Sequence, residues 1–477
     1  MNELATEEAR PALARTTRRT RITAVIVASA FFMQNLDSTI IATALPTMAK
    51  AFDADPVHMS VALTAYLLSL AVFIPASGWV ADRFGGRNVF RLAIAVFTLG
   101  SILCGRADSL PFLVVARIIQ GAGGAMMIPV GRIVLLRTAA KSEIVAAMAW
   151  LTTPALIGPV LGPPLGGLIV TYLSWRWIFD INIPIGILGI LLASRYIEDV
   201  REPPTSRFDL LGLLLSAVAL ACLMFGFETI GRGVVEAWVS LTSFAVGAGA
   251  GLLYWLHARR HPAPLIDFGL LRFPSFAVPI FAGSLFRIGV GALPFLLPMM
   301  LQIGFGDSAV QSGLITFASA AGALLMKPVA QRALRRFGFR DTLVWNAAVA
   351  AIMLGLCATF SPAWPAIGMY LVLLVGGFFR SLQFTAYNSL AYAELERSQI
   401  SAATSFYSAV QQLSLTVGIT VGAASLQVAM WFSGHDQPGT VDFRLAFVVI
   451  AVLALFAAPL SLRMPRAVGE EMSGASR

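Results

Sequence analysis

Long apolar runs recur along nearly the whole chain, separated by short polar and basic segments. Each run holds about 20 mostly apolar residues, the length that a helix needs to cross the hydrocarbon core of a bilayer. Only 12% of the 477 residues are charged, about half of what a soluble domain carries. The sequence therefore predicts an all-α membrane protein. The fourteen runs lie near 22–45, 59–80, 89–107, 110–133, 144–170, 176–194, 209–228, 237–257, 274–300, 309–330, 342–361, 364–390, 401–430 and 443–463. Twelve spanning helices with two interfacial segments are the alternative.

The basic residues indicate how these helices are oriented. Of the 34 Lys and Arg residues, 25 lie in or beside loops on one side, and four lie inside apolar runs. The opposite side holds only Lys50, Arg106, Arg176, Arg232 and Arg444. Because cytoplasmic loops carry the excess of Lys and Arg, we expect both termini in the cytoplasm, as tails 1–21 and 465–477. We expect a multi-pass protein of the bacterial inner (plasma) membrane. The net charge of +9 is scattered in short clusters, so we expect no nucleic-acid partner.

A short loop sequence occurs twice. Arg83-Phe84-Gly85-Gly86-Arg87 recurs 253 residues later as Arg336-Phe337-Gly338-Phe339-Arg340. The same offset places the first five apolar runs on runs nine to thirteen, which predicts two parallel repeats with substrate bound between them at mid-membrane. The predicted organisation is a six-helix bundle at 22–200, inserted helices seven and eight at 205–260, and a second six-helix bundle at 272–464.

Several classes of protein are disfavoured by what the sequence lacks. The segment up to Arg21 is polar and basic and the first apolar run is long, so we expect no cleavable signal. No G-x-x-x-x-G-K-[S/T] loop occurs, so energy must come from an ion gradient or from the gradient of the substrate. Each cysteine stands alone in an apolar run, and the four histidines lie at helix ends or loops, with only His257 and His261 close in sequence. We expect no disulfide, metal site or cofactor, and no enzymatic activity.

A charged motif lies between the second and third runs. Its residues Gly78-Trp79-Val80-Ala81-Asp82-Arg83-Phe84-Gly85-Gly86-Arg87 resemble the loop signature G-x-x-x-D-R-x-G-R-[R/K] of the major facilitator superfamily. A glycine allows close helix approach at Gly78 and a tight turn at Gly85. We expect Asp82, Arg83 and Arg87 to latch neighbouring helix ends on the cytoplasmic side. Ordinary positive-inside charge is the alternative. The predicted gate motif is Gly78, Asp82, Arg83, Gly85 and Arg87.

The first run ends with an acid-containing motif. Leu36-Asp37-Ser38-Thr39-Ile40-Ile41-Ala42-Thr43-Ala44-Leu45-Pro46 resembles the L-D-x-T-[I/V]-x-N-x-A-L-P signature of the fourteen-helix drug:proton antiporters of the QacA/EmrB type, with Ala42 in place of the family's Asn. Arg117-Ile118-Ile119-Gln120-Gly121-Ala122-Gly123 resembles the R-x-x-Q-G-x-G motif, which that family links to proton coupling. An acid within a spanning segment is costly unless it is paired or functional.

Asp37 and Arg117 are predicted to lie at a similar depth in the membrane. Asp37 lies about 13 Å before the outer end of its run, and Arg117 about 10 Å past the outer end of the fourth. A buried Arg would hold Asp37 ionised, and weakening the pair would let the acid take a proton. We therefore predict that Asp37 carries the proton and that Arg117 modulates it; a fixed structural salt bridge is the alternative.

A glycine-rich motif lies in the fifth run. Gly158-Pro159-Val160-Leu161-Gly162-Pro163-Pro164-Leu165-Gly166-Gly167 resembles the G-x-x-x-G-P-x-x-G-G motif of exporters, so the direction of transport rests on resemblance. Small residues permit close helix contact, and packing alone is the alternative. The predicted antiporter motif is Gly158, Gly162, Pro163, Gly166 and Gly167. Two further stretches, Arg287-Ile288-Gly289 and Pro298-Met299-Met300-Leu301-Gln302, are most similar to the MdtD/HsrA-like subset.

The remaining polar residues at membrane depth are candidates for a substrate cavity: Gln34, Gln120, Arg287, Gln302, Arg380 and Gln383. Lys327 lies near an inner helix end, from which its side chain can reach the cytoplasm. Asp180 is either a loop-facing residue near the outer surface, which we favour, or a second acid.

Together these features predict a monomeric, proton-coupled exporter of small organic molecules, with the substrate, protons and the lipid bilayer as its partners. Export of drugs or toxic compounds is the first hypothesis. Because Arg287 and Arg380 have no obvious acidic partner in the membrane, organic anions or metal chelates are the alternative substrates. A nutrient importer on the same fold and a transporter-like sensor stay open.

Overall fold

The computed structural model describes residues 17–53, 56–198, 208–229, 235–434, 438–466, 468–469 and 472, and this part of the chain is helical without strands. Every predicted apolar run lies on helix. Within the described residues, twelve helices are long and apolar enough to cross a membrane.

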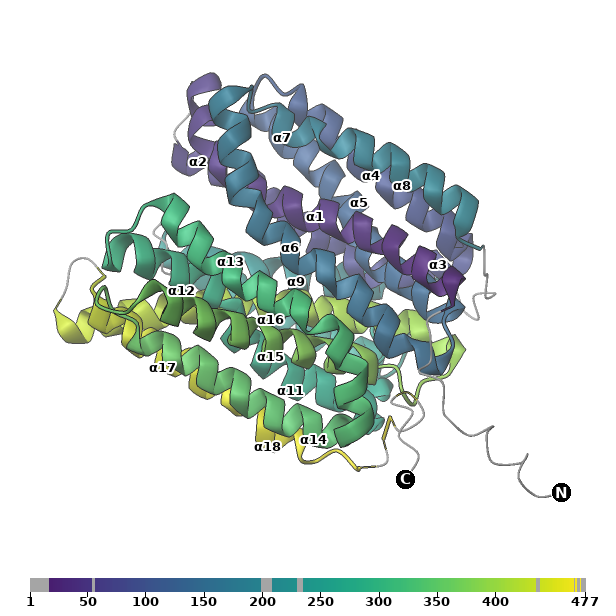
Figure 1. Ribbon diagram of the computed structural model, residues 1–477. Helices are drawn as coiled ribbons and strands as arrows, with labels where there is room; N and C mark the ends of the chain where they lie inside the picture. Colours follow the sequence, from purple (N-terminus) through teal and green to yellow (C-terminus); the bar gives the residue numbers. More distant parts are fainter. Residues whose placement is uncertain are drawn as a thin grey trace.

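The N-terminal half is a bundle in which α1 lies along α6 and α4 lies along α5 (Figure 1). The second predicted span is divided into α2, the short helix η1 and α3, and the sixth into α7 and α8. The helices are α1 (Arg18–Ala51), α2 (Pro56–Phe73), η1 (Ile74–Ala76), α3 (Ser77–Phe84), α4 (Gly86–Gly105), α5 (Leu110–Thr138), η2 (Lys141–Glu143), α6 (Ile144–Tyr172), α7 (Trp177–Asp180) and α8 (Asn182–Tyr196).

Two helices, α9 (Leu210–Thr229) and α10 (Ala237–Ala258), pack against each other as a hairpin. Helix α9 also contacts α2 of the N-terminal half and α16 of the C-terminal half. The Thr420 hydroxyl of α16 donates to the Phe227 carbonyl of α9 at 2.6 Å. The inserted pair is thus attached to both halves.

The C-terminal half lies below the N-terminal half in Figure 1, with α17 and α18 on its far side. Three of its helices have a proline in the first turn, where a missing N–H costs little. These prolines are Pro274, Pro294 and Pro328. The helices are η3 (Phe268–Arg272), α11 (Pro274–Gly291), α12 (Leu293–Met299), η4 (Met300–Gly304), α13 (Ala309–Leu325), α14 (Lys327–Leu356), η5 (Cys357–Thr359), α15 (Ala366–Leu390), η6 (Arg397–Gln399), α16 (Ile400–Ser433), α17 (Thr440–Leu455) and α18 (Ala457–Ser461).

The repeated loop sequence has the same backbone conformation in both copies. Gly85, between α3 and α4, has φ 86° and ψ 132°, and Gly338 has φ 71° and ψ 171°. Residues with a Cβ avoid this region of backbone space. Gly338 interrupts α14 with a non-helical backbone conformation, and the residues after it begin a new span. The glycine in each copy therefore makes the turn between two helices.

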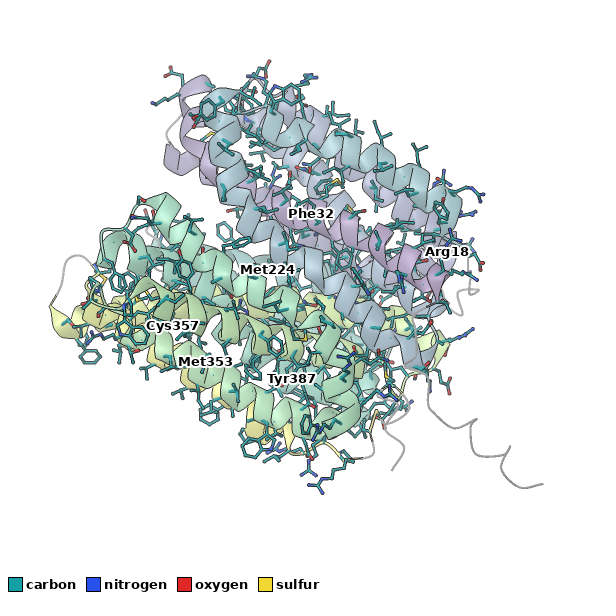
Figure 2. All side chains as sticks on the ribbon, viewed as in Figure 1. Arg18, Phe32, Met224, Met353, Cys357 and Tyr387 are labelled. Atoms are coloured by element: carbon teal, nitrogen blue, oxygen red, sulfur yellow. The ribbon has the colours of Figure 1, made fainter. Side chains whose placement is uncertain are left out.

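The outer surface of the bundle is apolar. Large side chains that a soluble protein would bury are exposed, among them Leu92, Leu188, Trp238, Trp345 and Trp431. A monomer in water rarely exposes so many large apolar side chains, so these surfaces match lipid contact. The three cysteines are free thiols on α4, α9 and η5. Figure 2 shows Phe32 in the N-terminal half and Met353, Cys357 and Tyr387 in the C-terminal half.

Candidate functional site

The N-terminal half buries one ion pair between α1 and α5. Arg117 Nη1 lies 2.7 Å from Asp37 Oδ2, and the side chains are 0% and 1% exposed. The guanidinium also lies over the ring of Tyr66 on α2, 4.2 Å from its centroid. The prediction that Asp37 and Arg117 are neighbours is confirmed. Both charges are shielded from water, so each depends on the other for compensation.

Two amides complete the surroundings of the acid. Gln120 Nε2 donates to Asp37 Oδ1 at 2.9 Å, and Asn182 Nδ2 donates to the same oxygen at 3.0 Å. Ser101 Oγ accepts from Asn182 at 2.9 Å and donates to the Phe179 carbonyl. An ionised carboxylate can accept hydrogen bonds from one Arg and two amides at once. This network occupies both oxygens of Asp37 and joins α1, α5 and α8.

The glycine motif of α6 packs directly against the turn that carries Asp37. A Cβ at Gly158 would lie 3.0 Å from the Asn35 Cβ, and one at Gly162 would collide with Thr39. Gly166 is buried, whereas a Cβ at Gly167 would meet nothing within 4 Å. The side chain of Pro163 lies outside the described residues. Gly158 and Gly162 thus let α6 approach the segment around the buried acid, as the small-residue stripe predicted.

The two halves are joined at the end of the molecule that carries Gly85, which we call the Gly85 end. Gly78 N donates to Ser405 Oγ at 2.8 Å, and a Cβ at Gly78 would lie 2.5 Å from the Ser401 carbonyl oxygen. Ser77 and Ser405 exchange a hydroxyl hydrogen bond at 3.0 Å. Close helix approach at Gly78 is confirmed, and its partner is α16 of the other half.

The acid of the gate motif has partners other than those the motif suggested. Asp82 Oδ1 lies 2.5 Å from Arg137 Nη2 of α5 and accepts from Ser401 Oγ of α16 at 2.6 Å. Arg137 also donates to Ser401 at 2.9 Å. No ion pair joins Asp82 to Arg83 or Arg87 among the described residues. In this conformation Asp82 joins the ends of α3, α5 and α16 through Arg137 and Ser401, and the expected participation of Arg83 and Arg87 is not seen, because α5 and not the loop supplies the counter-charge.

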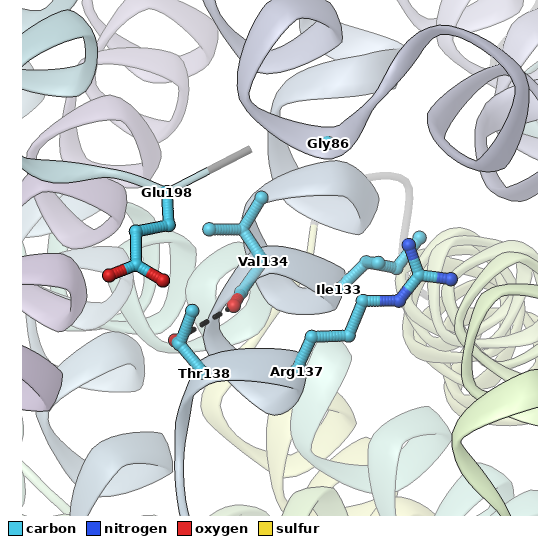
Figure 3. Close-up of a pocket in the computed structure, with 6 residues that line it drawn as sticks. All are labelled: Gly86, Ile133, Val134, Arg137, Thr138 and Glu198. Atoms are coloured by element: carbon cyan, nitrogen blue, oxygen red, sulfur yellow. Dashed lines mark hydrogen bonds between the residues drawn. The ribbon is translucent and has the colours of Figure 1, made fainter. Parts of the chain in front are cut away.

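A small pocket lies beside this latch (Figure 3). Arg137 and Glu198 face it, and Thr138 Oγ1 donates to the Val134 carbonyl in its wall at 2.9 Å. None of the residues that line the pocket belongs to the hydrogen-bond network of Asp37. Its six lining residues are Gly86, Ile133, Val134, Arg137, Thr138 and Glu198.

Arg287 lies buried in the C-terminal half, and no carboxylate of the described residues pairs with it. It donates to the Pro279 carbonyl at 3.2 Å and to the Tyr407 hydroxyl, which itself donates to Asn388 at 2.9 Å. Arg132 of the N-terminal half lies 5.4 Å from the centroid of the same Tyr407 ring. The Pro279 carbonyl and the Tyr407 hydroxyl thus accept hydrogen bonds from the Arg287 guanidinium. Two cations from opposite halves thus lie against one tyrosine.

The other predicted cavity residues do not form one cluster. Gln383 is fully buried between Asn346, which donates to it at 2.6 Å, and the Leu343 carbonyl. Arg380 is half-buried and donates to Ser319. Gln302 is exposed on η4 and donates weakly to Ser312 at 3.5 Å.

Two further predictions concern the N-terminal half. Gln34 is buried with Tyr66 and Gly124, whereas Gln120 belongs to the acid network. Asp180 lies 3.6 Å from the exposed Arg106 and is 18% exposed, so it does not join Asp37.

The sequence did not reveal which side chains form hydrogen bonds with the motif residues. Asn182 was assigned no role from the sequence, because nothing in its spacing points toward Asp37. Ser101, Ser401, Ser405 and Tyr407 carry no signal of their own, because serine and tyrosine are common in spanning helices. A search for polar residues at the depth of Asp37 would have found Ser101 and Asn182.

The helical halves, the buried ion pair and the latch at one end define a polytopic transporter. The model of the major facilitator superfamily matches residues 27–258 and 279–474. The chain belongs to the major facilitator superfamily and is a transporter of that family rather than an enzyme.

Relatives in sequence and proteins of similar structure are also transporters. The putative multidrug resistance protein MdtD of Salmonella heidelberg (strain SL476) is 38% identical over 455 residues, covering 94% of this chain and 95% of the relative. The same protein of Salmonella typhimurium (strain LT2) is 38% identical over 459 residues, with the same coverage. The human organic anion transporter MFSD10 (TETRAN) aligns with TM-score 0.65 and 14% identity over 93% of this chain and 99% of that chain. The proton:xylose symporter XylE aligns with TM-score 0.66 and 14% identity over 94% and 97%. The chain thus falls in the MdtD-like subset of the superfamily.

Proposed function

We propose that this chain is a proton-coupled exporter of small organic molecules, including drugs and toxic compounds, across the bacterial inner membrane. The observation that carries the proposal is the buried contact of Asp37 with Arg117, together with Gln120 and Asn182. An acid at this depth is an expensive feature to keep in a membrane helix. The names of the MdtD relatives support drug efflux as the task.

The coupling follows from competition for Asp37. While Asp37 is ionised, Arg117 and the two amides bind it and fix α1, α5 and α8 together. A proton on the carboxyl removes the charge that Arg117 compensates, so Arg117 must seek another acceptor. The turn of α1 against Gly158 and Gly162 then becomes free to shift. Proton binding on one side of the membrane is thereby linked to the packing of the N-terminal half.

The fourteen-span topology is part of the proposal. Helix α6 has 29 residues without a charged side chain, which exceeds the about 20 apolar residues that a span needs. Helix α13 has 17 residues and continues through the first part of α14 as far as Gly338. Adding these two segments gives fourteen spans, an even number that keeps both termini on one side.

The proposed halves are 22–200 and 272–464, with 205–260 inserted between them and tails at 1–21 and 465–477. The Gly85 end is then cytoplasmic, because it carries the loops rich in Arg. The contacts of Gly78 and Asp82 with α16 support a conformation that is closed on the cytoplasmic side. Both halves belong to one chain, so a monomer supplies a complete pathway.

Export of organic anions or metal chelates is the second candidate. Arg287 and Arg380 have no carboxylate partner among the described residues. Arg132 is a third guanidinium of the interior, and it lies beside Tyr407 as Arg287 does. Cations at membrane depth without acidic partners favour a negatively charged ligand. The cavity residues proposed for this candidate are Gln34, Gln120, Arg287, Gln302, Arg380 and Gln383, which lie at separate places in the present conformation.

The decisive experiment is transport in inside-out vesicles that are acidified by respiration. Addition of a true substrate should dissipate the proton gradient in vesicles with the wild-type chain and not in vesicles with Asp37→Asn. A panel of lipophilic cations, organic acids and metal chelates separates the two candidates. Failure of every substrate to release protons, with uptake that persists after the gradient is collapsed, would contradict proton coupling.

A further inference from the structure

The inserted hairpin gathers three metal-ligating side chains at one end. Asp209 immediately precedes α9, His257 lies in the last turn of α10, and His261 follows that helix. The antiparallel packing of α9 on α10 brings these residues together although 48 residues separate Asp209 from His257. The histidine pair was visible in the sequence, but the acid was not associated with it.

The three side chains converge on a small volume. His257 Nε2 lies 2.8 Å from Asp209 Oδ1, and His261 Nδ1 lies 4.0 Å from Asp209 Oδ2. One donor atom from each residue lies within 4.8 Å of the other two. The two imidazole rings are 5.2 Å apart and inclined by 33°.

One carboxylate oxygen in this cluster lacks a hydrogen bond. Asp209 Oδ1 accepts from Gly212 N at 2.8 Å, which caps α9, and contacts His257. Oδ2 is buried and has no hydrogen-bond partner within the described part of the chain, and the Asp209 side chain is 2% exposed. A buried anionic oxygen in this state carries a large desolvation cost. The site therefore has a strong acceptor facing the two imidazoles.

We propose that Asp209, His257 and His261 form a binding site for a divalent transition-metal ion of the Zn²⁺ type. Two imidazoles and a carboxylate match the ligand preference of Zn²⁺ and its neighbours, whereas Mg²⁺ and Ca²⁺ prefer oxygen. Tetrahedral Zn²⁺ with bonds of about 2.1 Å holds its ligand atoms about 3.4 Å apart. The present separations are 2.8 Å from His257 Nε2 to Asp209 Oδ1 and 4.0 Å from His261 Nδ1 to Asp209 Oδ2, so each imidazole faces one oxygen of the carboxylate at a distance close to that value.

Binding requires only local changes. The His257 hydrogen bond to Asp209 is replaced by coordination from Nε2 after loss of its proton. The backbone N–H of Ala263 now lies 3.3 Å from His261 Nδ1, a long contact that coordination would replace. Both imidazoles are partly exposed, so water can reach a fourth coordination position.

The site adjoins the gate motif. Phe208, next to Asp209, packs against Trp79 of α3 with ring centroids 4.6 Å apart. A bound ion would fix the start of α9 and hence the residue that contacts the gate. The site is independent of the Asp37 network and of drug export, so it can be tested without transport.

The test is Zn²⁺ titration of the purified, tag-free full chain in detergent by calorimetry, after removal of metal with a chelator. We expect one Zn²⁺ per chain, and at least about tenfold weaker binding in His257→Ala, His261→Ala and Asp209→Asn. Asn at 209 keeps an oxygen to cap α9 while removing the charge. His58→Ala, on α2, is the matched control and should bind as wild type. Equal Zn²⁺ affinity in all four variants, or no saturable binding by wild type, would overturn the site.

A second measurement uses only the wild-type chain and so does not depend on how the variants fold. Diethylpyrocarbonate modifies accessible imidazoles, and mass spectrometry locates the adducts. We expect Zn²⁺, and not an equal concentration of Mg²⁺, to protect His257 and His261. Modification of both residues that is unaffected by Zn²⁺ contradicts the proposal.

Discussion

Arg117 of α5 and Asp37 of α1 meet through one 2.7 Å contact inside the N-terminal half, and neither side chain touches solvent. The remaining guanidinium nitrogens of Arg117 have no second carboxylate nearby in the described residues. Asp37 is thus the carboxylate that pairs with Arg117 within the described part of the chain, and Arg117 would lose its anionic partner if that carboxylate were removed.

Asp37→Asn should abolish proton-coupled export while leaving membrane insertion intact. The amide is nearly the same size and still accepts from Gln120 or Asn182, but it cannot carry a proton between two states. Substrate efflux against its gradient should fall to the background of cells without the protein. Asp180→Asn, which alters an acid near Arg106 outside this network, should retain efflux and serves as the control. Full efflux by Asp37→Asn would remove the acid from the mechanism.

Arg117→Ala should destabilise the protein more than the double change Asp37→Asn with Arg117→Ala. Removing one member of a buried ion pair leaves an uncompensated charge, at a cost of about 3–5 kcal/mol. Removing both charges avoids that cost. Thermal unfolding midpoints in detergent measure the difference. A double variant that is less stable than Arg117→Ala would show that the pair contributes little.

Gly78→Ala should weaken the closure at the Gly85 end. The new Cβ would lie 2.5 Å from the Ser401 oxygen and 2.7 Å from Ser405 Oγ, and overpacking of this kind costs about 1–3 kcal/mol. In a chain without its native cysteines, a cysteine placed at Thr404 should then react faster with a maleimide added from the cytoplasmic side. Gly249→Ala, on α10, where nothing lies within 4 Å, is the matched control. Unchanged labelling in Gly78→Ala would exclude a latch at this contact.

Gly338→Ala should lower the free energy of unfolding through the backbone alone. No atom lies within 4 Å of a Cβ at this position, but φ is 71° and ψ is 171°. A residue with a Cβ in this region costs about 1–3 kcal/mol. Gly313→Ala, on α13 with equally open surroundings, isolates the conformational effect. Equal unfolding midpoints for the two variants would show that the turn relaxes without strain.

Arg287→Ala and Arg380→Ala should reduce export of organic acids several-fold more than export of a quaternary ammonium dye. Both arginines lack a carboxylate partner in the described residues, so an anionic ligand would gain most from them. Arg195→Ala, at the end of α8, is the control. Vesicle uptake of one labelled acid and one labelled dye supplies the comparison. Unchanged organic-acid transport by both variants, beside strong dye export, would reject the anion candidate.

The helices were accessible from the sequence because lipid imposes a simple length and composition rule. Every apolar run became helix, and Gly85 and Gly338 repeat one turn as the repeated loop indicated. The depth of Asp37 and Arg117 followed from a rise of about 1.5 Å per residue, since neither helix is broken between that residue and its outer end.

Contacts across the molecule were less accessible. The partner of Asp82 is Arg137, 55 residues away, because the direction in which α5 leaves the membrane decides which Arg reaches the loop. Asp209 and His257 meet through the packing of a hairpin, which periodicity does not reveal. The contact of Asn182 with Asp37 depends on the short break between α7 and α8 at Ile181. These relationships require the three-dimensional path of the chain.

The attachment of α9 to both α2 and α16 has a mechanical consequence. If the halves rotate against each other to expose the opposite side of the membrane, α9 cannot follow both surfaces without sliding on one of them. The hydrogen bond from Thr420 to the Phe227 carbonyl favours movement of α9 together with α16. The sliding would then take place at the contact between α9 and α2. The contact between α9 and α2 would then limit how fast and how far the two halves can rotate relative to each other.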